Sequence, residues 1–320
     1  MAAEAPATRI APLDHERAGR SLNRFTTVLL VGWLMFIVLF MVLRRAALSP
    51  DVFFVFVSVI AVMLGRGRTF IRDWGPFLLL FLAWEAMRGV AYQFGAEVQS
   101  DSVIAVERFL AFGVVPPVAL QQWLYQPGRI GPLEISMAAI YAAHFVLPLT
   151  VAFLLWVKRR GAYYHYVIAL MLMSFAQFFT AILMPVAPPR FAGQFGEALP
   201  IVDIGHEVTL QTGIGVVSWA YQNINANPVA AFPSLHAAYP ILAFLFLRER
   251  WPRWSWLMLA YAAVVWFAIM YLGHHYLVDA LGGLLYAVVA YTVVRAFTSG
   301  RIRTPFRQPA RGRALGSWAR

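Results

Sequence analysis

The sequence of 320 residues contains no cysteine, and its only lysine is Lys158. The absence of cysteine excludes disulfide bonds and thiolate metal sites, but it leaves the compartment open because membrane proteins on either side of a bilayer can lack cysteine. Charged residues make up only 13% of the chain, which excludes the charge-rich surface of an ordinary water-soluble protein. Apolar residues make up 61% and aromatic residues 15%, and this composition is typical of a membrane protein.

The positive charge of the chain is carried almost entirely by arginine. The formal net charge is +11, and much of it lies in short loops and in the tail beyond Arg295. Arginine at such places is typical of membrane topology signals and of contact with anionic lipid headgroups. We therefore expect no nucleic-acid partner.

Eight apolar segments are candidates for crossing a bilayer core of about 30 Å. They are residues 25–43, 52–64, 74–94, 133–157, 164–184, 234–247, 254–272 and 276–297. The segment 52–64 is short, so it either crosses with the help of its neighbours or is partly re-entrant. The sequence thus predicts an all-α integral membrane protein with about eight transmembrane helices.

Four regions follow from this pattern. Residues 1–24 are polar and carry no cleavage site after a short apolar core, so we expect a cytoplasmic tail and not a cleaved signal. Residues 25–72 are expected to form an N-terminal transmembrane hairpin, residues 73–297 a catalytic transmembrane domain, and residues 298–320 a basic cytoplasmic tail.

The charged loops predict the orientation in the membrane. Basic residues gather in three loops at 66–72, 158–160 and 248–253, whereas the longer loops at 95–131 and 185–232 carry few. Basic loops face the cytoplasm in most membrane proteins, so both termini are expected to be cytoplasmic. Arg44 and Arg45 in the first outer loop run against this pattern.

Two short motifs at the edges of apolar segments carry the candidate chemistry. They are FPSLH at 232–236 and HHYLVD at 274–279. His275 and Asp279 are four residues apart and share one face of a helix, so the carboxylate can hold one ring nitrogen and leave the other to react. His236 follows a Pro-Ser turn that is typical of a helix start. A nucleophile, an orienting carboxylate and a separate proton donor are the groups that covalent phosphoryl transfer needs.

These motifs resemble the second and third signatures of the type 2 phosphatidic acid phosphatase superfamily of membrane enzymes. MPVAPP at 184–189, FPSLH at 232–236 and MYLGHHY at 270–276 with Asp279 are most similar to the branch of inositol phosphorylceramide synthases and their bacterial relatives. The resemblance implies a six-helix core, here with the N-terminal hairpin added, and a phosphohistidine mechanism without a metal or other cofactor. It assigns His275 as the nucleophile, Asp279 as its orienting carboxylate, and His236 as the acid for the leaving group and then the base for the acceptor.

The sequence departs from the wider superfamily in its cations. The phosphatases carry a Ser-Arg pair ahead of the third motif, where this chain has Ala268 and Ile269. Arg190 is the one cation well placed to bind phosphate, together with the helix start at Ser234, where the helix dipole favours an anion. A phosphodiester carries about one negative charge and a monoester about 1.5 to 2, so a site with few cations favours a diester donor.

Other polar residues within the predicted spans have two interpretations. Glu85 and Arg88 lie three apart on one helical face, so they either neutralise each other or contact substrate. His144 is either a structural hydrogen-bonding residue or a headgroup ligand. The loop 185–232 is expected to form a lid, and Asn225 and Asn227 in it suit a polyol headgroup such as inositol, although such turns are also common without a ligand.

The sequence therefore predicts a lipid phosphotransferase of the cell membrane. It would move a phosphoryl headgroup from a phospholipid donor to a lipid-alcohol acceptor, at a site on the extracytoplasmic face. With water as the acceptor, the same residues would make a lipid phosphate phosphatase. A third interpretation is a transporter or channel in which Glu85, Arg88 and His144 line a path, and it predicts that His275→Ala leaves function intact.

Overall fold

The computed structural model describes residues 50–91, 96–144, 146–213 and 227–299, together with residues 32, 35 and 94. The chain divides into two units, Met1–Ala46 and Ala47–Arg320. The second unit holds nearly all of the described residues. The predicted span 25–43, apart from residues 32 and 35, and the predicted tail 1–24 lie outside the described residues, as does the basic tail from residue 300 onwards.

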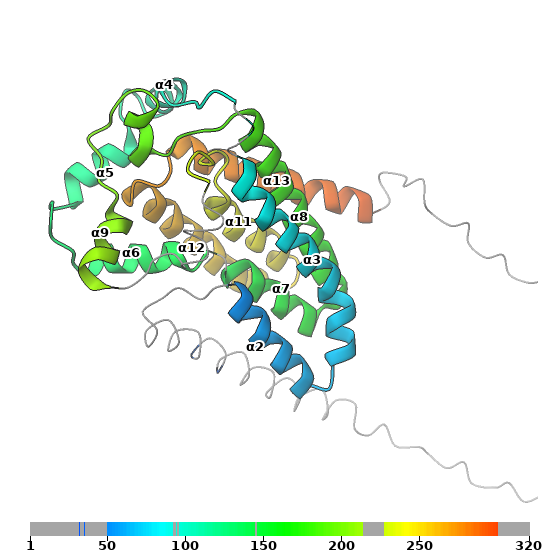
Figure 1. Ribbon diagram of the computed structural model, residues 1–320. Helices are drawn as coiled ribbons and strands as arrows, with labels where there is room; N and C mark the ends of the chain where they lie inside the picture. The colour runs from blue at the N-terminus through cyan, green and yellow to red at the C-terminus, as the bar shows by residue number, and fades with distance from the viewer. Residues whose placement is uncertain are drawn as a thin grey trace, which may run out of the picture. The chain divides into compact units, whose positions relative to one another are not determined.

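Every regular element in the described part of the second unit is a helix (Figure 1). There are eleven α-helices and one 3₁₀-helix. They are α2 (Pro50–Met63), α3 (Gly67–Ala91), α4 (Asp101–Leu110), α5 (Pro116–Leu124), α6 (Pro132–Ala142), α7 (Val146–Lys158), α8 (Arg160–Leu183), η2 (Pro189–Gln194), α9 (Ile204–Thr212), α11 (Leu235–Arg248), α12 (Pro252–Tyr271) and α13 (Leu277–Thr298). The predicted all-α fold is therefore confirmed.

Three of the described helices are long and apolar enough to cross a membrane, namely α8, α12 and α13. The pair α6 and α7 adds a fourth when it is taken as one broken span. Two other apolar helices are shorter, and the 14 residues of α11 extend about 21 Å at 1.5 Å per residue. The chain is thus a multi-pass membrane protein with three or four candidate spans among the described residues. The total of eight spans remains a prediction.

The predicted span 133–157 is bent and not continuous. Helix α6 ends at Ala142 and α7 begins at Val146, with an angle of 50° between them. Pro148 lies in the first turn of α7. Proline lacks the amide hydrogen that would bond to the carbonyl four residues earlier, at His144, and its ring crowds that carbonyl. A proline here disfavours a helix that continues from α6 but is tolerated in the first turn of a new helix such as α7.

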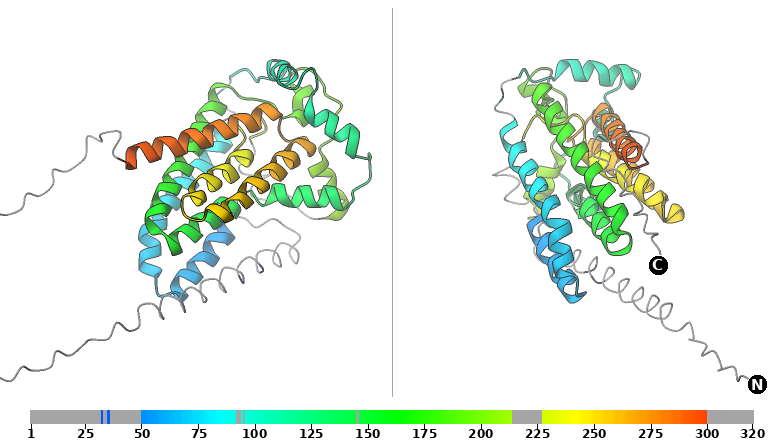
Figure 2. Two further views of the ribbon diagram at one scale, coloured as in Figure 1. Left: turned by 180° about the vertical axis from the view of Figure 1, so that it is seen from behind. Right: turned by 90° about the vertical axis from the view of Figure 1, so that its right-hand side faces the viewer.

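Helix α11 is the interior helix of the bundle. It packs against α7, α8, α12 and α13 (Figure 2). Its residues are buried along most of its length, including Tyr239, Pro240 and Leu242. A helix that is apolar on all sides is expected in such a surrounded position. The start of α11 carries one of the two sequence motifs, so the motif is held by the core of the protein.

The two long loops predicted at 95–131 and 185–232 contain short helices. We call α4, α5, η2 and α9 the cap, because they lie at the end of the bundle where α11 begins and α12 ends (Figure 1). Helix α4 crosses this end at a wide angle to α8 (Figure 2, right). Ile104 of α4 and Ala192 of η2 pack on Tyr276, the residue that precedes α13. The cap therefore lies directly on the second sequence motif.

Candidate active site

The two sequence motifs meet where the start of α11 touches the first turns of α13. The amide of Ser234 donates a hydrogen bond to the carbonyl of Asp279 at 3.0 Å. One turn further along α13, a Cβ atom on Gly283 would lie 2.3 Å from the carbonyl oxygen of Ser234. Only a residue without a side chain permits so close an approach. Gly283 therefore allows the two motifs to share one site.

Asp279 holds the ring of His275 by one nitrogen. Its Oδ2 lies 3.3 Å from Nδ1 of His275 and also accepts a hydrogen bond of 2.9 Å from the amide of Tyr276. The Asp279 side chain is fully buried, so these contacts are shielded from water. The contact at Nδ1 fixes the tautomer in which Nε2 carries the lone pair.

That nitrogen of His275 faces the second histidine. Nε2 of His275 lies 3.3 Å from Nδ1 of His236. The ring of His236 is stacked on Tyr141, with centroids 4.5 Å apart and planes inclined by 14°, and its centroid lies 3.9 Å from that of His144. The Nε2 atom of His236 is buried and has no hydrogen-bond partner in the part of the chain that the structure describes. The structure thus brings together the three residues that the motif spacing selected.

The two histidines open onto a half-open pocket of about 620 Å³, including space open to solvent. Its polar walls include Arg88, Arg190, Gln177 and Asn227, together with His144 and His274 at the histidine end. Trp84, Pro188, Pro228 and Tyr239 supply much of the remaining wall. The lining surface is more polar than apolar, which suits a charged or hydroxylated headgroup better than a hydrocarbon chain.

Two arginines line this pocket, which corrects the expectation that Arg190 is the one well-placed cation. Arg88 reaches the pocket from α3, where it lies over the ring of Trp84 at 5.0 Å. It also forms an ion pair of 3.3 Å with Glu85, as their spacing predicts. The geometry is compatible with both interpretations of this pair, mutual neutralisation and substrate contact, because Arg88 is neutralised and also faces the pocket. Because Arg88 is already paired with Glu85, it adds a hydrogen-bond donor to the pocket but no surplus positive charge.

The proline-rich segment is joined to the first motif by a short extended pairing. Val186 forms parallel bridges with Gln99 on one side and Ala230 on the other. The segment then turns into η2, and the amide of Arg190 donates to the carbonyl of Gly273 at 3.1 Å. These contacts place Pro188 and Arg190 in the pocket wall.

Asp203 connects Arg190 with His274, a contact that the sequence analysis missed. Its Oδ2 lies 3.2 Å from Nε of Arg190, and its Oδ1 lies 3.4 Å from Nε2 of His274. Asp203 also caps α9 by accepting a hydrogen bond from the amide of His206. A lone aspartate in a long loop gives no signal of these contacts beyond a possible helix cap.

Burial and charge shift the pKa values of this cluster. Burial raises the pKa of Asp203, but the contact with His274 and the charge of Arg190 more than offset it and hold that pKa well below its usual range. Burial, together with Arg190, lowers the pKa of His274 to about 4 against the opposing effect of Asp203. At neutral pH the cluster therefore contains an anion, a cation and a neutral histidine.

Glu107 of α4 supports the second motif from the cap. Its fully buried carboxylate accepts hydrogen bonds from the amides of Leu277 and Val278, at 2.8 and 2.9 Å. These amides are the first of α13, and a carboxylate at a helix N-terminus satisfies them. Burial raises the pKa of Glu107. The sequence analysis missed this residue because it lies 170 residues before the helix that it caps.

The remaining predicted residues have varied positions. Ser234 is fully buried and caps α11, and its amide is already bonded to Asp279, so its polar groups serve the architecture. Asn227 lines the pocket, whereas Asn225 lies outside the described residues. His144 has both predicted features, because Nδ1 lies 3.1 Å from the carbonyl oxygen of Tyr141 and the ring lines the pocket. Among the described residues, no group of three or more histidine or acidic side chains is arranged to hold a metal ion.

Fold and site together define a class: a helical multi-pass membrane protein with a carboxylate-bound histidine facing a second histidine in a pocket with two arginines. Residues 101–293, more than half of the chain, match the family described as the PAP2 superfamily. The chain therefore belongs to the PAP2 superfamily of enzymes, as the motif resemblance predicted.

Three relatives give the nearer likeness. The chain is 28% identical over 169 residues to the phosphoinositol dihydroceramide synthase of Bacteroides thetaiotaomicron, covering 49% of this chain and 55% of that protein. It is 41% identical over 61 residues to the inositol phosphorylceramide synthase of Candida albicans, covering 19% and 13%. It is 30% identical over 118 residues to the inositol phosphorylceramide synthase catalytic subunit of Saccharomyces cerevisiae, covering 34% and 29%. The matches thus span at most about half the length of these relatives, and no solved structure matches the chain.

Proposed function

We propose that this protein is a membrane phosphotransferase that moves a phosphoryl headgroup from a phospholipid to the hydroxyl of a second lipid. The observation that carries the proposal is the His275 side chain, whose Nδ1 is held by Asp279 while Nε2 faces His236 in a pocket with Arg88 and Arg190. An oriented nucleophile beside a second acid–base group is the arrangement of covalent catalysis. Family membership supports the same chemistry.

In the first step, Nε2 of His275 attacks the phosphorus of a phosphodiester. The bond from phosphorus to the lipid oxygen breaks, and His236 in its protonated form gives that oxygen a proton. The phosphoryl headgroup is then bound to His275 as a phosphohistidine, and Asp279 stabilises the positive charge that develops on the ring. Arg88 and Arg190 offset the charge of the phosphate oxygens.

In the second step, a lipid hydroxyl takes the place of the departed alcohol. His236, now neutral, removes the proton of this hydroxyl as its oxygen attacks phosphorus. The bond to His275 breaks, and both histidines return to their starting states. The contact of 3.3 Å between the two rings must open to admit the phosphate, so substrate entry separates them.

The donor headgroup that we propose is of the phosphoinositol type. The relatives are named as inositol phosphorylceramide or phosphoinositol dihydroceramide synthases. The amides of Asn227 and Gln177 line the pocket on this chain and can hydrogen-bond a polyol. Asn225 is proposed as a further headgroup contact from its place in the sequence.

We propose eight spans, with the site on the extracytoplasmic face and both termini in the cytoplasm. The helix directions support this orientation. Helix α8 starts at the basic junction at 158–160. Helix α13 starts at the site, and α11 runs from the site to Arg248. The basic junctions at 158–160 and 248–253 therefore lie at the end of the bundle away from His275, as the positive-inside rule requires.

The test is transfer by the purified protein in nanodiscs that contain phosphatidylinositol and a panel of lipid alcohols, with products followed by mass spectrometry. Wild-type protein is expected to form a new phospholipid, and His275→Ala is expected to form none. His165→Ala is the matched control, because His165 does not line the pocket. A product that persists in His275→Ala would refute the proposed nucleophile. No transfer product from the wild type, with lipid binding that is equal in wild type and His275→Ala, would favour a transporter.

Hydrolysis is the second candidate, because the pocket presents two arginines to a phosphate group. Its substrate would be a phosphate monoester of a phosphatidic, polyprenyl or sphingoid lipid, and each arginine is already paired with a carboxylate, Arg88 with Glu85 and Arg190 with Asp203. Release of inorganic phosphate from such lipids, without any transfer product, would identify a phosphatase.

A further inference from the structure

A second cavity lies at the end of the bundle away from the candidate active site. It is a half-open cavity of about 680 Å³, including space open to solvent, between the α2–α3 connection and the junction of α7 with α8. Helix α8 begins there and ends near the pocket, and its 24 residues extend about 36 Å at 1.5 Å per residue. The lining residues are Arg66, Thr69, Trp156, Val157, Lys158 and Arg160. Three of these six residues are cationic, and none is acidic.

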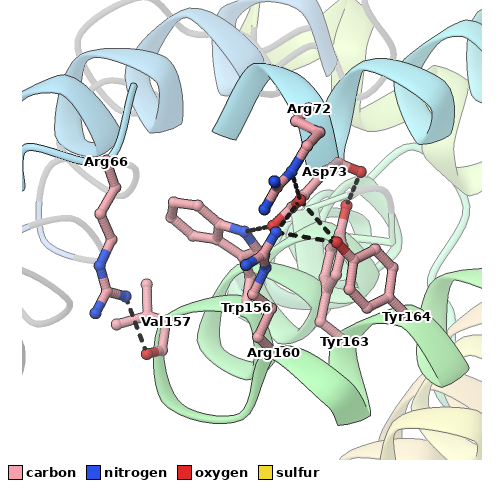
Figure 3. Close-up of polar contacts among 8 residues, drawn as sticks. All are labelled: Arg66, Arg72, Asp73, Trp156, Val157, Arg160, Tyr163 and Tyr164. Carbon is pink, nitrogen blue, oxygen red and sulfur yellow. Dashed lines mark hydrogen bonds and ion pairs between the residues drawn. The ribbon is translucent and has the colours of Figure 1, made fainter. Parts of the chain in front are cut away.

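A buried aspartate fixes one wall of this cavity. The side chain of Asp73 is fully buried and accepts hydrogen bonds from two nitrogens of Arg160, from Nε1 of Trp156 at 2.9 Å and from the hydroxyl of Tyr164 at 2.7 Å (Figure 3). The hydroxyl of Tyr163 donates to its backbone carbonyl at 3.1 Å. Both oxygens of the carboxylate therefore have hydrogen-bond donors, and these contacts hold Arg160 and Trp156 in place.

The other wall carries positive charge that Asp73 does not contact. Arg66 extends away from the aspartate and donates to the carbonyl of Val157 at 3.4 Å (Figure 3). That acceptor is neutral, so the hydrogen bond positions the guanidinium without balancing its charge. Lys158 lines the same space. Arg66, Lys158 and Arg160 thus give the cavity three cationic lining residues, of which Arg160 is paired with Asp73.

Basic residues that serve only as a topology signal do not need to line a cavity. Basic residues that only follow the positive-inside rule can be fully solvated, as the exposed Arg68 and Arg159 are. Arg66, Lys158 and Arg160 are instead half-buried around a half-open cavity, beside the hydroxyl of Thr69 and the ring of Trp156. Basic pockets between helices at the cytoplasmic side are suited to lipid headgroups, and tryptophan is typical of the level of the headgroups.

We propose that this cavity binds the phosphate-bearing headgroup of an anionic phospholipid in the cytoplasmic leaflet. The phosphate takes the centre of the cavity, where Arg66, Lys158 and Arg160 surround it and Thr69 can donate a further hydrogen bond. Because the ligands come from two connections, the bound lipid joins the α2–α3 hairpin to α7 and α8. The proposal shares the orientation given above but does not depend on the proposed reaction.

The test compares the thermal unfolding of the full-length protein in detergent with three additions: phosphatidylglycerol, phosphatidylcholine and inorganic phosphate. Phosphatidylglycerol is expected to raise the Tm in a saturable manner, whereas phosphatidylcholine has no such effect. Native mass spectrometry would count the retained lipid. An equal response to inorganic phosphate at the same concentration would overturn the assignment to a lipid.

The decisive variant is Arg66→Gln with Lys158→Gln, and its matched control is Arg250→Gln with Arg253→Gln. Both variants remove two charges from basic connections at this end of the bundle. The first variant is expected to weaken phosphatidylglycerol binding about 25-fold, at about fivefold for each cation, while the control stays near the wild type. Equal losses in both variants, or no loss in the first, would show that the attraction is diffuse and would overturn the site.

His275→Ala serves as a second background. It is expected to keep the response to phosphatidylglycerol, because the cavity and the active site lie at opposite ends of the bundle. Loss of this response in His275→Ala would show that the lipid effect arises at the active site and would overturn the proposal.

Discussion

At the scale of single residues, the site depends on carboxylates that hold other groups. Asp279 holds His275, Asp203 holds Arg190 and His274, and Glu107 holds the first amides of α13. A buried carboxylate with several partners orients them more firmly than a solvated one, because water does not compete for the contacts. Three carboxyl groups thus position the reactive nitrogens and Arg190.

Asp203→Asn is expected to lower kcat/KM for the donor by roughly 10- to 100-fold, mainly through a higher KM. The substitution removes the charge that positions Arg190, and small displacements of a binding group have effects of this order. Steady-state kinetics would measure the change. Glu207→Gln on the same helix is the control, because Glu207 does not line the pocket. Equal kinetics for Asp203→Asn and wild type would show that Arg190 needs no positioning by this residue.

The low pKa of His274 predicts a pH dependence of stability. His274 titrates at about 4 in the folded protein and near 6.5 when unfolded, so between these values the unfolded chain binds more protons. Stability is therefore expected to fall as the pH falls from about 6.5 towards 4. The low pKa of Asp203 adds a loss in the same direction below its unfolded value of about 3.9.

Thermal unfolding across this pH range would measure the effect. His274→Gln removes the titrating group, so its Tm is expected to depend less steeply on pH between 4.5 and 6.5 than that of the wild type. Identical slopes for the two proteins would contradict the shift assigned to His274.

At the scale of helices, the close contact between α11 and α13 is the feature that assembles the site. Asp279 and Gly283 lie one turn apart on α13 and meet the amide and the carbonyl of Ser234. Gly282 supports the same approach, since a Cβ there would lie 2.5 Å from the ring of Phe232. Two adjacent glycines thus let the first motif lie directly against the second.

Gly283→Ala is expected to move the start of α11 away from α13 and separate His236 from His275. The added methyl group would overlap a backbone oxygen, so we expect a loss of stability of about 1–3 kcal/mol and a larger loss of activity. Gly161→Ala on α8 is the matched control, because its Cβ would meet no atom within 4 Å. Full activity in Gly283→Ala would show that the helix contact is not required at this distance.

The sequence predicted those parts of the site that depend on local spacing. His275 and Asp279 are related by one helical turn, and His236 follows a recognisable helix start, so these residues could be selected without a structure. Glu107 and Asp203 could not, because their partners lie far away in the chain and nothing in the local pattern marks them. The predicted spans agree with the structure for α8, α12 and α13, whereas the break between α6 and α7 was missed although Pro148 could have indicated it.

At the scale of the whole molecule, the two ends of the bundle differ in kind. One end carries the cap, the two histidines and the larger number of acidic side chains with defined partners, such as Asp203 and Glu107. The other end carries the basic connections and the Asp73 cluster. The polarity that supports the proposed orientation in the membrane also separates the proposed reaction from the proposed lipid site.

The measurement that tests the central claim most directly is detection of the covalent intermediate. Wild-type protein would be mixed with phosphatidylinositol carrying a radiolabelled phosphate, quenched at high pH where phosphohistidine survives, and digested for mass spectrometry. We predict label on the peptide that contains His275 in the wild type, and none in His275→Ala. Label on another residue, or transfer product without any labelled protein, would contradict the account.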